Sequence, residues 1–171
     1  MTRGLPILAA ACWLATVGGC RIEERIPESA RTTAPPDTTA VLAVLRSYYR
    51  DFSARDWNAF QSHFWTGADI TTVWQPPGDS ARRVDVMPVP EFVRRAPEGP
   101  GSRAIFEEQM QSARIVVRHD LASAWVRYRA RFGDPGDVQE WEGHDLFTLM
   151  RLEGEWRIVE LAFTPEPGGT P

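Results

Sequence analysis

The feature that most constrains the fold is a period-two alternation of apolar and polar side chains between residues 104 and 163. Such alternation is typical of strands that bury one face. It predicts strands at residues 104–117, 121–132, 138–150 and 156–163, separated by the turn sequences RHD, GDPGD and LEGE. Because turns this short join antiparallel neighbours, we expect a run of antiparallel strands, with a bend in the first one at FEEQMQ.

The sequence before these strands has helical spacing. Apolar residues recur at helical intervals in residues 37–56 and, after a short break, in residues 57–65. Asp56 is a suitable cap for the second helix. The β-branched run at residues 68–74 predicts a strand, and residues 91–95 predict a short helix. Helices followed by antiparallel strands predict an α+β domain with the helices on one face of a sheet.

The first twenty residues predict a cellular address rather than an element of the fold. The apolar run from Leu5 to Val17 is too short to span a hydrocarbon core of about 30 Å. It follows a single arginine, as in a secretory signal peptide. The ending VGGC resembles a bacterial lipobox, which implies removal of residues 1–19 and lipidation of Cys20. We therefore expect an extracytoplasmic lipoprotein anchored in the bilayer, which in a Gram-negative cell would lie at the outer membrane or the periplasmic face.

Both ends of the remaining chain lack a repeating pattern. Residues 20–36 are polar and contain prolines, so we expect a flexible tether there. Residues 165–171 are rich in glycine and proline and predict a disordered tail. The folded domain is therefore expected at residues 37–164.

The expected domain offers little for metal or cofactor chemistry. Both cysteines lie in the first twenty residues, and the three histidines are too scattered to predict a metal site. The sequence contains no glycine-rich phosphate loop and no nucleophile elbow. A net charge of −4 argues against a nucleic-acid partner. We therefore expect no metal, no cofactor and no nucleic acid.

Two stretches, DWNAFQSHFWTGADITTVW and WEGHDLFTLMRLEGEWRIVELAFT, resemble the nuclear transport factor 2-like superfamily, which includes polyketide cyclases and ketosteroid isomerases. The later stretch is similar to the SnoaL-like bacterial branch, in which a Gly–x–Asp strand precedes a turn and a W-[KR]-I-V strand. The resemblance covers residues 37–164. It implies a cystatin-like roll, a cone-shaped and curved antiparallel sheet wrapped around N-terminal helices, with a pocket at one end. The superfamily contains enzymes, transport adaptors and proteins of no assigned activity, so the fold alone supplies no function.

Side-chain alternation predicts which residues face this pocket. His144 and Asp145 are neighbours in one strand, so they point to opposite faces and cannot form a pair. Asp145 shares its face with Trp141 and Phe147, where desolvation raises the pKa of a carboxyl group, and it is the first candidate for a general base. Glu160 is the second candidate. Ordinary core packing, or a carboxylate bound to the backbone, is the competing interpretation. The expected pocket lining is His63, Trp65, Trp74, Tyr128, Trp141 and Phe147.

The opposite face of the same strands combines arginines with glutamates. Arg127, Arg129 and Arg131 alternate on one strand, and Glu140 and Glu142 lie on the next. Side chains that face each other across two strands pair when their charges are opposite. We therefore predict cross-strand ion pairs on a solvated face rather than a site for anions.

Three functions compete on this evidence. The first is an anchored module that binds a small apolar or aromatic molecule in the cone pocket. The second is a homodimeric interaction domain of the envelope, and the third is a cofactor-free isomerase, hydratase or cyclase. Replacing Asp145 with Asn would stop the enzyme. Replacing Tyr128 or Trp141 with Ala would stop ligand binding, and a charge at Leu161 or Phe163 would disrupt the dimer.

Overall fold

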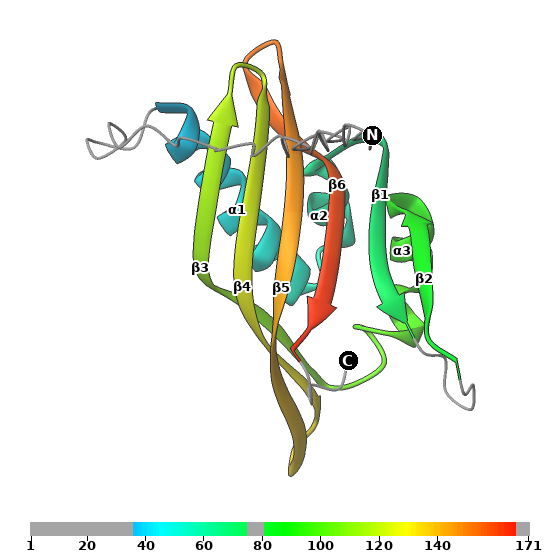
Figure 1. Cartoon of the computed structure of the whole chain (residues 1–171). Helices are drawn as coiled ribbons and strands as arrows, with labels where there is room; N and C mark the ends of the chain where they lie inside the picture. Colours follow the sequence, from blue (N-terminus) through cyan, green and yellow to red (C-terminus); the bar gives the residue numbers. More distant parts are fainter. Residues whose placement is uncertain (1–35, 75–80, 167–171) are drawn as a thin grey trace, which may run out of the picture. The chain divides into compact units, whose positions relative to one another are not determined.

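The computed structural model describes residues 36–74 and 81–166 of the chain (Figure 1). The predicted signal peptide, Cys20 and the predicted tether up to residue 35 lie outside these residues, as does most of the predicted tail. None of the described helices is long and apolar enough to cross a membrane.

Two helices begin the described part. Helix α1 spans Pro36–Ala54 and ends where Arg55 takes a positive φ of 57°. Helix α2 spans Trp57–Ser62. The side chain of Asp56 accepts a hydrogen bond from the backbone N–H of Ala59 at 3.0 Å, which makes it the predicted N-cap. The buried stripe of α1 has the spacing that the sequence predicts and comprises Val41, Leu45, Tyr48 and Phe52.

The rest of the described chain forms a six-stranded sheet with the order β2-β1-β6-β5-β4-β3. Its strands are β1 (Phe64–Trp74), β2 (Arg83–Pro88), β3 (Ile105–Arg118), β4 (Leu121–Asp134), β5 (Asp137–Leu152) and β6 (Glu155–Pro165). Helix α3 (Val89–Arg95) and a 3₁₀ turn (Ala96–Glu98) lie between β2 and β3. Strands β3 to β6 form the antiparallel run that the alternation predicts.

The predicted α+β fold is confirmed, with a curved sheet around N-terminal helices, but the sheet is mixed rather than purely antiparallel. Strand β1 pairs with β6 in parallel, with Ile70 opposite Leu161. Strand β2 pairs with β1 in antiparallel fashion and was not predicted. It is a short edge strand whose side chains are mostly exposed, so its sequence lacks the buried face that reveals a strand.

The helices lie against one face of the sheet (Figure 1), and aromatic rings hold them there. The ring of Tyr48 in α1 meets the ring of Phe147 in β5 edge-on, with centroids 5.1 Å apart. Phe52 stacks on Phe60 of α2, also at 5.1 Å. Each such pair contributes about 0.5–1.5 kcal/mol beyond the area that it buries. This packing fixes α1 as the inner wall of the cone.

Two irregularities in strand pairing change which side chains face inward. In β3 the register shifts between Met110 and Ser112, within the stretch where a bend is predicted. Before that bulge the even-numbered residues of β3, such as Glu108, point toward the helices. A second shift lies between Thr148 and Leu149 of β5, opposite β6. A bulge adds one residue and so reverses the alternation beyond it.

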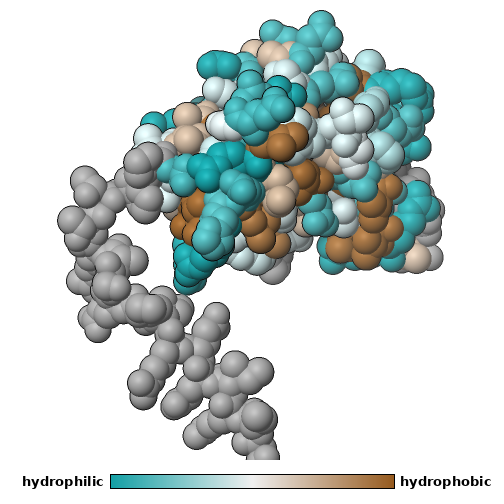
Figure 2. Space-filling view, turned by 90° about the horizontal axis from the view of Figure 1, so that it is seen from above, coloured by the Kyte–Doolittle hydropathy of each residue, from teal (hydrophilic) through white to brown (hydrophobic). Residues whose placement is uncertain are grey.

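The outer face of the sheet has the predicted ion pairs. Arg131 contacts Glu140 at 3.0 Å and Glu107 at 2.9 Å. Arg129 also pairs with Glu140, and Arg127 pairs with Glu142. In the view of Figure 2, exposed apolar side chains lie in separate groups among hydrophilic ones. The prediction of cross-strand pairing on a solvated face is confirmed, and exposed pairs of this kind contribute little to stability.

Candidate functional site: a cavity between helix α1 and the sheet

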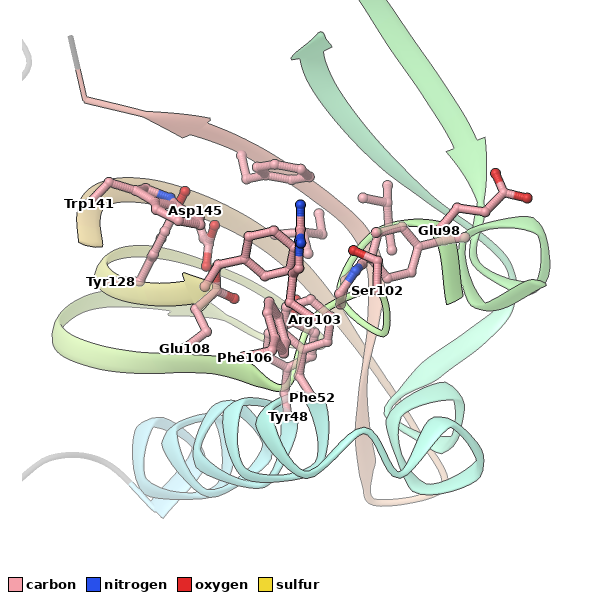
Figure 3. A pocket seen from close by; sticks show the side chains of 17 residues that line it. Tyr48, Phe52, Glu98, Ser102, Arg103, Phe106, Glu108, Tyr128, Trp141 and Asp145 are labelled. Atoms are coloured by element: carbon pink, nitrogen blue, oxygen red, sulfur yellow. The ribbon is translucent and has the colours of Figure 1, made fainter. Parts of the chain in front are cut away.

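A cavity of about 360 Å³ lies between the helices and the inner face of the sheet. Side chains of α1, β1, α3, the segment before β3, and strands β3 to β6 form its wall (Figure 3). Most of that wall is apolar. The rings that line it include Phe52, Phe92, Phe106, Phe132, Trp141 and Phe163.

Asp145 is a buried carboxyl group in this wall. It lies in β5, and only 3% of its surface is exposed. The hydroxyl group of Tyr49 in α1 donates a hydrogen bond to its Oδ2 atom. Burial raises the pKa of Asp145 to about 7, although the bond from Tyr49 favours the ionised form. Asp145 therefore changes its charge close to neutral pH.

Glu108 is a second carboxyl group in the same cavity. The β3 bulge turns it inward, and Ser53 of α1 holds its backbone through two hydrogen bonds of 2.9 Å. Burial raises its pKa well above the ordinary value, and the charge of Asp145 raises it further. Among the described residues, none donates a hydrogen bond to the Glu108 carboxyl group. Because the charge of Asp145 raises the pKa of Glu108, simultaneous ionisation of the two carboxyl groups is disfavoured.

Figure 3 shows Glu108 and Asp145 in the same part of the cavity, near Tyr128 and Trp141. Burial raises the pKa of Tyr128, and the charges of Glu108 and Asp145 add to this effect. The indole N–H of Trp141 donates a hydrogen bond to the Tyr128 hydroxyl group, which opposes the rise in pKa. We call the residues Tyr48, Glu108, Tyr128 and Asp145 the polar end of the cavity.

Gly143 gives Tyr128 its position. A Cβ atom at Gly143 would lie 2.4 Å from both Cζ and the hydroxyl oxygen of Tyr128, and 2.6 Å from the carbonyl oxygen of Thr164. Only a glycine therefore lets the Tyr128 ring cross β5 at this point. The Gly–x–Asp pattern has a physical meaning here. Gly143 leaves space for the Tyr128 ring, and Asp145, two residues later in the same strand, faces the same cavity.

The other end of the cavity is formed by the segment before β3. Glu98 and Ser102 lie there, away from Trp141, and Arg103 lies between Ser102 and Asp145 in this view (Figure 3). Arg103 pairs with Asp134 at 3.0 Å. The guanidinium charge of Arg103 is therefore already paired with Asp134, which is not part of the polar end.

The structure brings Tyr128, Trp141 and Asp145 together in the cavity wall. Their roles stay predictions. Phe147 does not line the cavity, which corrects the expectation, because it is fully buried beneath Tyr48 in the core. The side chain of Trp74 lies outside the described part of the chain.

The expectation that Glu160 faces the cavity is wrong. The register shift opposite β5 inserts one residue into β6, so Glu160 is exposed and Leu161 turns inward. Leu161 and Phe163 line the cavity. The apolar character of Leu161 and Phe163, which suggested contact with a partner chain, is thus explained by their place in the cavity wall of a single molecule.

His63 and Trp65 are also misplaced by the sequence reasoning. The Nε2 atom of His63 lies 2.7 Å from Oδ2 of Asp51, outside the cavity. The indole N–H of Trp65 donates to the carbonyl oxygen of Met150 at 3.1 Å, and the guanidinium of Arg157 lies 4.8 Å from its ring. Both side chains belong to structural contacts rather than to the cavity wall.

Sequence reasoning missed Glu108 and the segment before β3. The expected bend at FEEQMQ is the signal that could have found Glu108, because a bulge reverses the faces of the residues before it. The described residues contain no group of His, Cys, Asp or Glu side chains that could hold a metal ion. The carboxyl groups, tyrosines and aromatic rings of the cavity wall can supply hydrogen bonds, proton transfer and aromatic contact.

Comparison with known proteins identifies one family. The family described as "Putative lumazine-binding" matches residues 36–164. No curated protein matches the sequence.

Several solved structures share the fold. A nuclear transport factor 2-like protein with a cystatin-like fold from Novosphingobium aromaticivorans has a TM-score of 0.63 at 12% identity, over 78% of this chain and 84% of that one. One of unknown function from Shewanella baltica has a TM-score of 0.59 at 21% identity, over 80% and 98%. A putative scytalone dehydratase from Novosphingobium aromaticivorans has a TM-score of 0.59 at 10% identity, over 75% and 83%. At these identities the likeness shows the fold alone.

Proposed function

The chain belongs to the family described as putative lumazine-binding, and we propose that its cavity binds a flat heteroaromatic small molecule. One observation carries the proposal, namely a cavity with aromatic walls and a polar end built from two carboxyl groups and two tyrosines. Its volume of about 360 Å³ falls within the range of roughly 300–1,000 Å³ of small-molecule sites.

The wall suits a flat ring. Aromatic side chains such as Trp141 and Phe106 offer faces and edges to a bound ring system, with stacking contributions of about 1–3 kcal/mol per ring. The polar end supplies the few directed hydrogen bonds that set orientation in a mostly apolar site. Lumazine, a pteridine-dione, has this shape and chemistry, and it is the probe that the family description suggests.

The test is a fluorescence titration of the purified full-length protein with lumazine. Trp141→Ala removes a ring from the cavity wall, and we expect it to weaken binding about tenfold. Trp125→Ala is the matched control, because Trp125 is 55% exposed on the outer face, and we expect it to bind as the wild type does. Absence of saturable binding, or an equal loss in both variants, would overturn the proposal.

A second candidate function is cofactor-free proton transfer on the bound molecule. Asp145 favours it, because a carboxyl group with a pKa of about 7 is matched to general-base work at neutral pH. The test incubates wild-type and Asp145→Asn protein with a metabolite extract and follows the compounds by mass spectrometry. Conversion by the wild type alone supports an enzyme, and equal profiles argue for a binding module.

We also propose that Cys20 attaches the domain to a membrane through lipid chains. The support is the sequence VGGC after a short apolar run, and stable anchoring would take at least two chains. Labelling cells with a fatty-acid analogue tests it. Label on the wild type and its loss, with release from membranes, in Cys20→Ser is the expected result. Membrane association of an unlabelled Cys20→Ser protein would contradict it.

Dimerisation stays a prediction, but the surface expected to form the dimer is a different one. Since Leu161 and Phe163 line the cavity, the surface proposed here for a second copy is the outer face, where Leu121 and Trp125 are exposed. Analytical ultracentrifugation of wild type and Trp125→Glu tests this. A wild-type dimer that the substitution dissociates supports it, and a monomeric wild type rejects it.

A further inference from the structure

The polar end of the cavity contains a carboxyl group with no partner in the described part of the protein. Glu108 lines the cavity, yet the described residues give its carboxyl group no hydrogen bond. Glu108 is half-buried, and a polar group in a mostly apolar wall is normally satisfied by protein, water or ligand. The Glu108 carboxyl group is therefore available for a ligand.

Asp145 beside it has spare capacity as well. A carboxylate has two oxygens and about four acceptor positions, and Tyr49 uses only one of them, at Oδ2. Asp145 also lines the cavity. Its remaining acceptor positions are available to a donor that enters the cavity.

Among the residues that the structure describes, no cation acts on the pKa of either carboxyl group. Besides burial, the charge of Asp145 raises the pKa of Glu108, and the hydrogen bond from Tyr49 lowers that of Asp145. Tyr48 and Tyr128 are the other titratable groups that face the pair. The cation that lines the cavity, Arg103, is paired with Asp134. One carboxylic acid beside one carboxylate avoids two negative charges in the same part of the cavity.

We propose that Glu108 and Asp145 together recognise a ligand edge on which a ring N–H lies beside a ring C=O. This proposal rests on the function proposed above and specifies the chemical class of the ligand. Glu108 donates its carboxyl proton to the ring carbonyl oxygen, and Asp145 accepts from the ring N–H. Lactams and cyclic imides present this edge, so the ligands expected are heterocycles of the pyrimidine-dione and pteridine-dione type.

The same arrangement explains what the cavity should reject. A ring whose nitrogens are methylated cannot donate to Asp145 and would leave a buried carboxylate unsatisfied, which costs far more than a missing contact in water. An anionic ligand would place a further negative charge beside an uncompensated carboxylate. The pair therefore selects neutral heterocycles with a free N–H.

The test compares lumazine with 1,3-dimethyllumazine, which has the same ring system without its ring N–H groups. Isothermal titration calorimetry of the full-length wild-type protein at neutral pH should show about tenfold tighter binding of lumazine, because one hydrogen bond to a charged buried group is lost in the analogue. The preference should vanish in Asp145→Leu, which has lost the acceptor for the ring N–H. Glu108→Leu, which has lost the donor to the carbonyl oxygen that both probes share, should weaken both probes alike, whereas Glu108→Gln, whose amide still donates, should bind both probes as the wild type does.

The outcomes separate this inference from the function on which it rests. Equal binding of both probes to the wild type would overturn recognition by the carboxyl pair and leave the aromatic cavity as the binding site. A preference that persists unchanged in Asp145→Leu would show that the methyl groups merely crowd the cavity, and would overturn it too. Unchanged affinity of Glu108→Leu for both probes would overturn the role of Glu108. Failure of both probes to bind would overturn the proposed function itself.

Discussion

The hydroxyl group of Tyr49 donates a hydrogen bond to Oδ2 of Asp145, a residue 96 positions later in the chain. This bond ties helix α1 to strand β5 at the polar end of the cavity. It also acts on the charge of Asp145, since it favours the carboxylate while burial favours the acid. The position of helix α1 thus influences whether Asp145 is protonated.

Tyr49→Phe should raise the pKa of Asp145 above its value of about 7, because the carboxylate loses its hydrogen bond and keeps its burial. A ¹³C NMR titration of the Asp145 carboxyl carbon measures this shift. Tyr48→Phe is the matched control, because Tyr48 makes no hydrogen bond to Asp145 in the described structure. An unchanged or lower pKa in Tyr49→Phe would show that the bond does not stabilise the carboxylate.

Asp145 should make the protein less stable as the pH rises. Its folded pKa of about 7 exceeds the value of about 3.9 expected when unfolded, so its contribution is complete below pH ~4 and is lost as the pH rises through ~7. The full difference corresponds to roughly 4 kcal/mol. Glu108 acts in the same direction.

Urea unfolding from about pH 5.5 to 8 measures this dependence, since carboxyl groups with lowered pKa values have finished titrating below that range. The free energy of unfolding should fall with pH in the wild type and fall less in Asp145→Asn. Parallel curves for the two proteins would mean that Asp145 ionises with an ordinary pKa.

Gly143→Ala should displace the Tyr128 ring, because the new Cβ atom would lie 2.4 Å from it. Overpacking of this kind costs about 1–3 kcal/mol, and lumazine binding should weaken with it. In a double-mutant cycle, Tyr128→Ala should relieve part of the cost, with the remainder due to the carbonyl oxygen of Thr164. Additive effects of the two substitutions would refute the proposed contact.

Asp51→Asn should destabilise the fold and leave the cavity intact. Asp51 is 6% exposed and binds Nε of Arg50 at 2.7 Å and Nε2 of His63 at 2.7 Å. Loss of a buried charged partner costs about 1–3 kcal/mol, which thermal unfolding detects. Lumazine affinity should not change. Weaker lumazine binding without a loss of stability would instead indicate that His63 belongs to the functional site, as the sequence predicts.

The predictable part of the fold is the part with uninterrupted local patterns. Helix α1 shows its buried face directly, and strands β4 and β5 pair without a register shift, so alternation places Tyr128, Trp141 and Asp145 on one face. These three residues meet at the cavity for that reason.

The part of the fold that could not be predicted depends on single-residue shifts in strand register and on pairing between strands far apart in the sequence. The bulge in β3 turns Glu108 inward, and the shift in β6 turns Glu160 outward. Neither follows from alternation, which assumes one residue per step. The parallel pairing of β1 with β6 joins strands from opposite ends of the domain, and no local sequence pattern reports it.

The most direct measurement is a ¹H–¹⁵N NMR spectrum of the tryptophan indole N–H groups during titration with lumazine. Trp141 lies in the cavity wall, and Trp125 lies on the outer face with 55% of its surface exposed. Binding in the cavity should shift the Trp141 indole resonance and leave that of Trp125 in place. A shift at Trp125 alone, or no shift of either resonance at the highest soluble lumazine concentration, would contradict ligand binding in this cavity.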